Sequence, residues 1–340
     1  MLVAGLGPHG ENAAPLQRLS VTAADAETLR ARQFSVALVL HTTGSDWARQ
    51  HLAGIVAQLG ECGSLLVEVV DCAFSSEAQA SALRRLAREP LDAIISLPIG
   101  NEAVAEPHSE VAQSGKKLIL VDNAPTGLLP GRDYECLVSA DNFGLGTIGA
   151  QLLSPHIATG GTVGLLGYDV DFFATNQREI AFRKWMGSER PDLTVAIGKF
   201  RSLSLVEETT HQLCDRTPEL GGLYVVWDEP AIRSLTALRA RGLVMPVTTT
   251  DLGNQVALDL ARGGLIKGIA AQKPYDQGMA AAAASLLAMI GKQPPPWIAL
   301  PGLAVTARNV VSGYQSVWHA AAPTELLRHW RDTSAKQDGR

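Results

Sequence analysis

The sequence predicts an α/β protein with two lobes, each a doubly wound sheet of mainly parallel strands. Short apolar runs alternate with helical patterns along most of the chain, which is typical of parallel βαβ units. The alternation begins near Phe34 and restarts near Thr162, without a short sequence repeat. At 340 residues the chain is too long for one hydrophobic core and suits two lobes of ordinary size.

The composition favours a globular protein. Hydrophobic residues make up 46% of the chain and charged residues 19%, unlike a disordered chain. The net charge is −5 and no basic stripe stands out, so we expect no nucleic acid partner. No apolar stretch reaches the roughly 18 residues of a membrane-spanning helix. Residues 1–33 lack the charged start and apolar run of a secretory signal.

The four cysteines predict no metal site. They are Cys62, Cys72, Cys136 and Cys214. No CxxC pair and no Cys/His metal spacing occurs, so we expect isolated buried cysteines and no bound metal. A Cys62–Cys72 disulfide in an oxidising compartment stays open as an alternative.

The first half begins with a leader and then settles into regular alternation. Prolines and glycines punctuate the first 33 residues, followed by a short helix at Ala24–Arg32. Val36–Leu40 is continuously apolar, as expected of a strand buried on both faces. Asp46–Leu59 has helical spacing and ends near Gly60. The remaining strands expected here are Leu65–Val70, Ala93–Leu97, Lys117–Val121 and Cys136–Ser139, with helices Glu77–Arg88, Glu102–Ser114 and Asn142–Leu153.

The second half repeats the alternation. The expected strands are Thr162–Leu166, Thr194–Ala196, Leu223–Val226, Pro246–Thr249, Ile266–Ala270 and a last one near Leu303–Thr306. The expected helices are Thr175–Gly187, Leu205–Cys214, Ala231–Arg241, Val256–Arg262 and Gln277–Ile290. Gly291 and the three prolines at 294–296 end the last of these helices.

Three strands of the second half end on polar or aromatic residues, namely Trp227, Asp251 and Gln272. In an open α/β sheet, ligands bind beyond the carboxyl ends of the strands. An aromatic ring can stack on the apolar face of a small ligand while carboxylate and amide groups bond its hydroxyls. The combination suits a sugar or polyol.

Two matches to the dinucleotide pattern GxGxxG do not predict a cofactor site. In the first, Gly5–Gly10, the preceding strand would be too short and Pro15 interrupts the following helix. The second, Gly144–Gly149, lies inside an expected helix rather than between a strand and a helix. We therefore expect no cofactor.

From Phe34 to about Val311 the chain resembles the type I periplasmic sugar-binding proteins, in the ribose-binding group. The effector domains of lactose repressors share that fold. The order of the motifs carries the resemblance. These motifs are Ser45–Trp47 after the first strand, Asp122–Asn123, Ser139–Asn142, Arg178–Phe182, Asp228–Ala231, Asp251 and Gln272.

The resemblance implies two lobes that close by a hinge around an enclosed ligand. It implies crossings near Ala140, Gln272 and Gly302, and hence a leader at 1–33, a first lobe at 34–140 and 273–302, a second lobe at 141–272 and 303–315, and a tail at 316–340. It also implies a periplasmic, monomeric, non-enzymatic receptor that delivers a monosaccharide or sugar alcohol to the membrane permease of an ABC importer.

The predicted ligand-binding residues are His41, Ser45, Trp47, Asp122, Asn123, Phe173, Asn176, Arg178, Trp227, Asp251 and Gln272. The two Trp would stack on the ligand, the two Asp would accept hydroxyl protons, and Arg178 and Gln272 would add donors. Each has a structural alternative: a core Trp, a capping Asp, a solvated Arg or a satisfied strand-end His. Asp228 is a weaker candidate because it can cap the helix that starts near Pro230.

The chain departs from the ribose binders at several of these positions. Ser45 and Trp227 stand where they carry Asn, Asn123 where they carry Arg, and Ala181 where Gly is usual. A missing Arg and an added Trp change both the hydrogen-bonding groups and the shape of the predicted ligand site. We therefore expect a ligand other than ribose.

Two other functions stay open at this stage. One is a sugar-sensing regulatory domain, although the leader holds no helix-turn-helix and no basic arm. The other is an enzyme on a doubly wound sheet, since a fold does not fix a function. No nucleophile elbow, metal set or cofactor loop supports the enzyme.

Overall fold

Two six-stranded sheets organise the chain, which a computed structural model describes over residues 3–338, with side chains as far as Arg331. The first sheet has the order β11-β5-β4-β3-β1-β2 and the second β12-β10-β9-β8-β6-β7. The first contains β1 (Ser35–Leu40), β2 (Leu65–Asp71), β3 (Ala93–Ser96), β4 (Lys117–Val121), β5 (Cys136–Ala140) and β11 (Trp297–Leu300). The second contains β6 (Thr162–Tyr168), β7 (Thr194–Phe200), β8 (Leu220–Val225), β9 (Val247–Thr250), β10 (Ile266–Ala271) and β12 (Leu303–Val305).

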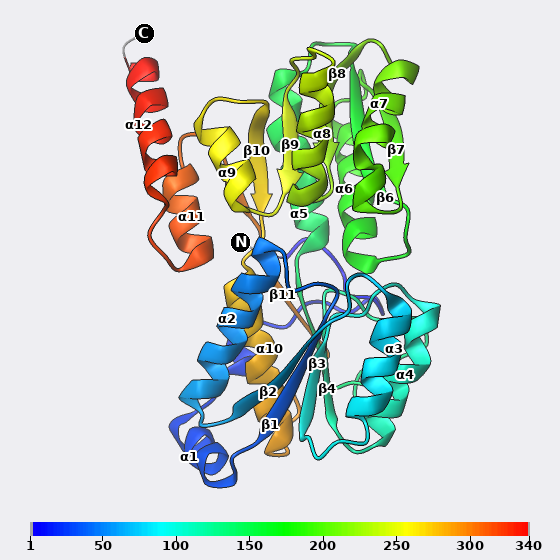
Figure 1. Ribbon diagram of the computed structural model, residues 1–340, viewed down its shortest axis with the longest axis vertical. Helices are drawn as coiled ribbons and strands as arrows, with labels where there is room; N and C mark the ends of the chain where they lie inside the picture. Colours follow the sequence, from blue (N-terminus) through cyan, green and yellow to red (C-terminus); the bar gives the residue numbers. More distant parts are fainter. Residues whose placement is uncertain (1–2, 339–340) are drawn as a thin grey trace.

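Helices cover both faces of each sheet, and the two lobes stack along the long axis of the molecule (Figure 1). The first lobe carries α1 (Ala23–Arg32), α2 (Asp46–Glu61), α3 (Ser76–Leu86), α4 (Glu102–Gln113) and α10 (Pro274–Met289). The second carries α5 (Asn142–Leu153), α6 (Phe173–Glu189), α7 (Val206–Arg216), α8 (Asp228–Ala240), α9 (Asn254–Ala261), α11 (Val310–Trp318) and α12 (Thr324–Asp338). The predicted fold class of two doubly wound lobes is confirmed.

The packing of α2 on α10 fixes one side of the first lobe. A Cβ at Gly54 would overlap the carbonyl oxygen of Tyr275, and a Cβ at Gly278 would overlap that of His51. The two helices therefore approach closely enough that only glycine fits at these positions. This contact holds the start of α2, which faces the second lobe, in a fixed place.

Within the described residues the chain passes between the lobes at three places: β5 to α5, β10 to α10, and β11 to β12. These lie at the positions expected near Ala140, Gln272 and Gly302. A Cβ at Gly302 would overlap the Leu145 side chain, so the last crossing is packed against α5. The residue limits given above for the two lobes stay a prediction.

The structure differs from the sequence prediction near the end of the chain. One final strand was expected, but β11 joins the first sheet parallel to β5 and β12 pairs antiparallel with β10. Between residues 317 and 331 the expected tail packs on the second lobe, since Val317 and Leu326 are buried in its core.

The leader also packs on the body of the protein. Leu19 and Leu29 are buried in the core of the first lobe, and Ala14 N donates to the carbonyl of Trp297. The backbone N–H groups of Ala4 and Gly5 donate to the carboxylate of Asp141, at the first crossing. The leader therefore reaches from the first lobe to the hinge.

The four cysteines are buried and free, so the alternative Cys62–Cys72 disulfide is absent. None of the helices between residues 3 and 338 combines the length and apolar character that a membrane crossing needs.

Candidate ligand-binding site between the lobes

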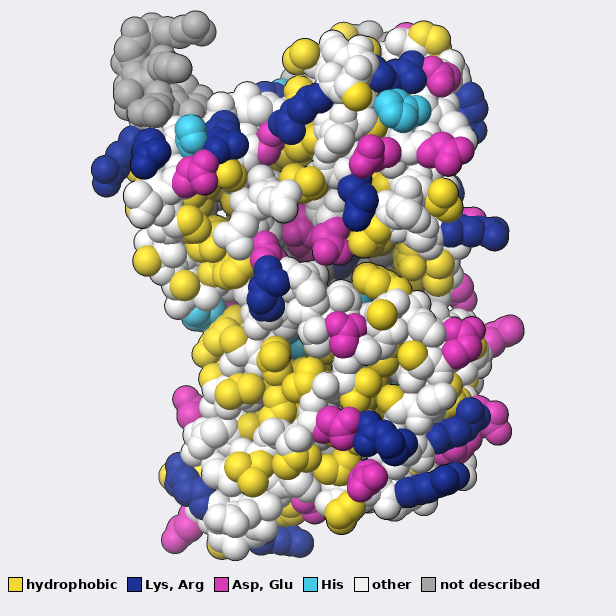
Figure 2. Space-filling view, viewed as in Figure 1, with side chains coloured by type: hydrophobic (Ala, Val, Ile, Leu, Met, Phe, Trp, Pro, Cys, Tyr) yellow, Lys and Arg dark blue, Asp and Glu magenta, His cyan; other side chains and the backbone are white. Residues whose placement is uncertain are grey.

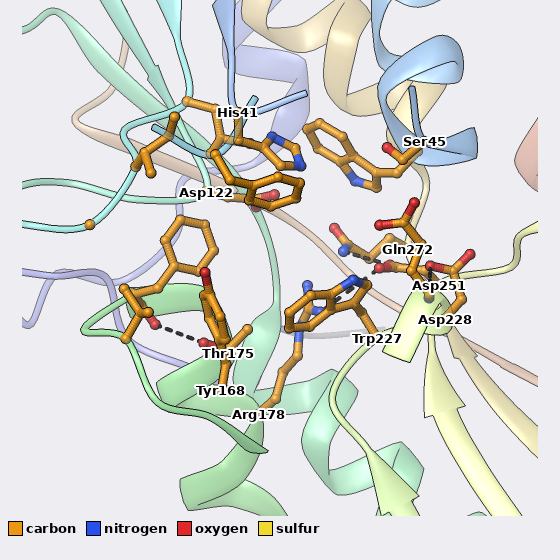
Figure 3. A pocket seen from close by; sticks show the side chains of 18 residues that line it. His41, Ser45, Asp122, Tyr168, Thr175, Arg178, Trp227, Asp228, Asp251 and Gln272 are labelled. Atoms are coloured by element: carbon orange, nitrogen blue, oxygen red, sulfur yellow. Dashed lines mark hydrogen bonds and ion pairs between the residues drawn. The ribbon is translucent and has the colours of Figure 1, made fainter. Parts of the chain in front are cut away.

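A cavity lies between the lobes, where strand ends of both sheets face each other (Figure 3). Its volume is about 100 Å³, counted over the positions that the centre of a water molecule can occupy. One water needs at least about 10–15 Å³ by this measure, so the cavity has room for one small ligand. The predicted residues that line it are His41, Ser45, Trp47, Asp122, Arg178, Trp227, Asp251 and Gln272.

Asp122 directly follows β4 and projects its carboxylate into the cavity from the first lobe. Its Oδ1 accepts from Ala140 N at 3.2 Å and from Gln277 Nε2 at 2.9 Å. Burial raises the pKa of Asp122 to about 6, and the positive charge of Arg178 opposes the rise. The second oxygen of this carboxylate is left to bond a ligand.

Asp251 directly follows β9 and faces the cavity from the second lobe. Its Oδ1 accepts from Gln272 Nε2 at 2.6 Å, and its Oδ2 lies 3.9 Å from Arg178 Nη1. Burial raises the pKa of Asp251, while the charge of Arg178 and the Gln272 hydrogen bond act against that rise. Gln272 thereby brings a lobe crossing into the site.

Arg178 projects from α6 and is only 4% exposed. Its Nε donates to Asn142 Oδ1 and its Nη1 to the carbonyl of Val226, both at 2.9 Å. A Cβ at Gly146 would overlap the Arg178 carbonyl, so α6 packs directly on α5. The guanidinium is therefore fixed before any ligand arrives.

Two tryptophans give the cavity flat apolar surfaces. Trp47 lies in the first turn of α2, which Ser45 caps by accepting from Ala48 N at 3.1 Å. Its ring stacks on His51 with centroids 4.7 Å apart. The Trp227 ring packs against Tyr168 with centroids 5.2 Å apart. Such surfaces suit the C–H face of a sugar ring.

His41 is a neutral member of the wall. Its ring lies 5.7 Å from that of Trp47 and 5.0 Å from that of Phe74, measured between centroids. Burial lowers the pKa of His41 to about 4, so the imidazole is uncharged at neutral pH. Its Nδ1 is buried without a hydrogen-bond partner and is free to bond a ligand.

Three predicted residues do not line the cavity. Asn123 Nδ2 donates to the carbonyls of Pro98 and Gly100, and its Oδ1 accepts from Phe173 N. Its Nδ2 is thus held by carbonyls of the first lobe, and its Oδ1 bonds the second lobe. Asn176 Nδ2 donates to Asp171 Oδ1 at 3.0 Å, away from the cavity.

For Phe173 the correction is a shift by one residue. Phe172, not Phe173, lines the cavity, because α6 begins at Phe173 and the preceding residue stays extended. Two lining aromatics were not predicted at all. Tyr168 ends β6, so the strand-end rule that found Trp227 could have found it. Phe74 lies in a turn with φ 59°, which no sequence pattern marks.

Two acidic residues complete one end of the cavity. Asp228 and Glu229 begin α8 and line the cavity beside Asp251. Burial raises the pKa of Asp228 well above its usual value, and the negative charges of Asp251, Glu229 and Asp46 add to the rise. Figure 2 shows Asp and Glu side chains gathered where the two lobes meet, and a shallow groove there is lined by Asp46, Asp228 and Glu229.

Asp46 also joins the lobes directly. Its Oδ2 accepts from Asn254 N at 2.8 Å and from Asn254 Nδ2 at 3.1 Å. The N-cap of α9 is Gly253, which has no side chain to supply these bonds. A first-lobe carboxylate therefore caps a second-lobe helix at the edge of the cleft.

Comparisons with known proteins point to one family. Residues 36–293 match the family described as periplasmic binding protein domain. The ribose import binding protein of Bacillus subtilis (strain 168) is 23% identical over 274 residues, covering 79% of this chain and 86% of that protein.

Solved structures share the fold. An ABC transporter solute-binding protein from Agrobacterium vitis, bound with α-D-tagatopyranose, superposes with a TM-score of 0.77 at 21% identity, over 85% of this chain and 99% of that chain. A solute-binding protein from Mycobacterium smegmatis with bound glycerol gives a TM-score of 0.74 at 18% identity, over 82% and 96% of the two chains.

Proposed function

Because this chain belongs to the periplasmic binding protein domain family, we propose that it is the solute-binding receptor of a carbohydrate ABC importer. It encloses one monosaccharide or sugar alcohol between its lobes and delivers it to a membrane permease. The relatives described above include proteins bound with a sugar and with a polyol, which supports this ligand class. The receptor acts in the periplasm as a monomer.

The observation that carries the proposal is the composition of the cavity wall. Tryptophan rings from both lobes offer stacking surfaces, and Asp122, Arg178 and Asp251 offer fixed hydrogen-bonding groups between them. A hydroxylated ring or chain presents apolar C–H faces and many donors, which is what such a wall accommodates. Both lobes contribute, so a ligand that bridges them favours the closed arrangement by its differential affinity.

Isothermal titration against pentoses, hexoses and polyols tests the proposal. We expect at least one of them to bind with a dissociation constant in the micromolar range or below, together with an increase in melting temperature. If no member of the panel produced heat or a thermal shift, and the protein purified from cells released no carbohydrate on denaturation, the proposal would fail.

We further propose that binding involves no turnover. The family and the relatives it matches are described as binding proteins. Ligand recovered after a long incubation should have an unchanged mass and amount. Conversion to a product would instead favour an enzyme. A ligand-dependent complex with a sensor kinase, without one with a permease, would favour the regulatory alternative.

A further inference from the structure

The charges of the cavity wall do not balance. Its lining includes the carboxylates of Asp122, Asp228, Glu229 and Asp251 but only one cationic side chain, Arg178. The positive charge of Arg178 acts on both Asp122 and Asp251, because it opposes the rise that burial causes in the pKa of each carboxyl. It leaves the other two acids without a share of its charge.

Asp228 is the carboxylate with least compensation. Glu229 has the nearby charge of Arg233 and a hydrogen bond from the Trp227 side chain. Asp228 Oδ1 accepts only from the backbone N of Glu229, at 2.9 Å, and within the described residues no Lys, Arg or His lies within 4.0 Å of its carboxylate. Its neighbours in the site are other acids. A half-buried carboxyl in such surroundings holds its proton more firmly, and a ligand that brings positive charge would favour its ionised form.

An unfilled acceptor points to the same side of the cavity. Gln272 is only 3% exposed, and its Oε1 has no hydrogen-bond partner. The amide orientation follows from Asp251, whose carboxylate oxygen accepts from Nε2 and leaves Oε1 turned to the site. Figure 3 places Gln272, Asp251 and Asp228 together at one end of the cavity. This end therefore offers acceptors and needs donors.

Aromatic surfaces next to these acceptors suit an organic cation. Trp227 lies beside Asp228 in the chain, and its ring lines the cavity. The face of an indole attracts an ammonium group electrostatically. The part of the chain that the structure describes holds no group of His, Cys, Asp or Glu side chains placed to bind a metal ion. An ammonium supplies both three donors and one positive charge.

Building on the proposed function, we propose that the physiological ligand is a hydroxylated amine, an amino sugar or an amino polyol. Its ammonium group lies against Asp228, Asp251 and Gln272 Oε1, with Trp227 beside it. Its hydroxyl groups bond the carboxylate of Asp122 and the guanidinium of Arg178. This ligand class would also explain why Asn123 stands where the ribose binders carry an arginine, since the ligand itself adds the positive charge.

Paired titrations at pH 7.5 test the proposal. Each pair compares an amine with its neutral counterpart: D-glucosamine with D-glucose, D-galactosamine with D-galactose, and 1-amino-1-deoxy-D-sorbitol with D-sorbitol. N-acetyl-D-glucosamine keeps the nitrogen but removes the charge. We expect the amine to bind at least tenfold more tightly in the pair that binds best, and acetylation to abolish that advantage.

The outcomes separate this inference from the proposed function. If neutral ligands bound as tightly as their amines, or more tightly, the amine proposal would be overturned while the receptor function stood. If no sugar, polyol or amine bound, both would be overturned. The mass of the ligand released from protein purified from cells gives a check that needs no variant, since an amine contains nitrogen and a neutral sugar does not.

Asp228→Asn tests the role of the charge. It keeps the size of the side chain, and we expect the preference for amine over neutral sugar to fall at least tenfold. Asp215→Asn, which removes an exposed acid of α7 outside the cavity, is the matched control and should leave the preference unchanged. Should Asp228→Asn fold poorly, Glu229→Gln supplies the second variant. An unchanged preference in a folded variant of each kind would contradict the proposal.

Discussion

Asp122 and Asp251 occupy equivalent positions in the two lobes. Each follows the fourth strand of its sheet, counted from β2 and from β7. Each has a left-handed backbone, with φ 54° and 71°, which is uncommon outside glycine. Each donates its N–H, at 3.1 Å, to a carbonyl of the neighbouring strand: Val138 for Asp122 and Ala270 for Asp251. The two lobes thus present matching carboxylates to one cavity.

Replacing one of these carboxylates should weaken ligand binding strongly. A charge-assisted hydrogen bond contributes about 1.5–3 kcal/mol, so we expect Asp251→Ala to raise the dissociation constant about 10- to 150-fold. Isothermal titration with the sugar that wild type binds most tightly measures the change. Asp215→Ala removes an exposed acid of α7 that does not line the cavity and should change affinity less than twofold. Equal affinity of the Asp251 variant and wild type would place the ligand elsewhere.

Trp227 should contribute through its flat surface rather than its polarity. Trp227→Ala removes the ring that packs on Tyr168 and faces the cavity, and we expect about a tenfold or greater loss of affinity. Trp227→Phe retains a ring and should recover part of the loss. Trp185→Phe, in α6 and outside the lining, serves as the control. Titration of all three with the same ligand would contradict the stacking role if the Ala and Phe variants bound equally well.

The close packing of α2 and α10 predicts a sharp difference between glycines of one helix. Gly54→Ala places a methyl group on the Tyr275 carbonyl and should lower the free energy of unfolding by about 1–3 kcal/mol. Gly60→Ala, near the end of the same helix, meets no atom within 4 Å and should be neutral or stabilise by about 0.5–1 kcal/mol. Urea denaturation compares the two. A similar effect of both substitutions would mean that helix propensity, not the helix contact, decides.

Much of this architecture was predictable because parallel strands buried on both faces are marked by apolar runs. The carboxyl ends of those runs also located Asp122, Trp227 and Asp251, since the residue after a strand must lie at the sheet edge. The strand β11 escaped because it begins at Trp297, directly after three prolines that mark a helix end. Its burial depends on the pairing with β5, which no local pattern reveals.

The cavity lining differs from the predicted set where a shift of one residue or one hydrogen bond decides which side chain faces the cavity. Phe172 and Phe173 are chemically identical, and only the exact start of α6 determines which ring faces the cavity. Asn123 has the residue type of a ligand-binding group, but its amide is consumed by Pro98, Gly100 and Phe173. Such competition between partners distant in the chain cannot be read from strand ends.

The contact between Asp46 and α9 should slow ligand release. Asp46→Ala removes a helix cap supplied across the cleft, a loss of about 0.5–2 kcal/mol from the arrangement in which the lobes meet. We expect the dissociation rate to rise about 2- to 30-fold, measured by stopped-flow tryptophan fluorescence. Arg49→Ala, which removes the ion-pair partner of Asp46 but keeps the cap, is the control. A faster association rate with unchanged dissociation would argue against a role in holding the lobes together.

Buried histidines should make the protein lose stability in mild acid. His108 is fully buried; its Nδ1 donates to the carbonyl of Val104 and its Nε2 accepts from Ser96 Oγ. Burial lowers the pKa of His108 from 6.5 to about 4. Between these pH values the unfolded chain binds a proton that the folded protein does not, so stability is complete above about pH 6.5 and is lost as the pH falls towards 4.

One such histidine can account for up to about 3 kcal/mol of this loss. His108→Gln removes the titrating group while leaving a side chain that can bond both neighbours. We therefore expect a smaller difference in unfolding free energy between pH 7.5 and pH 4.5 than in wild type, measured by urea denaturation at each pH. His211→Gln, on the outer helix α7, controls for the loss of a histidine that is not fully buried. The acids of the cavity, such as Asp122, titrate in the opposite sense but are present in all three proteins, so their effect cancels in the comparison. An equal pH dependence in wild type and His108→Gln would show that the buried imidazole does not cause the loss of stability in mild acid.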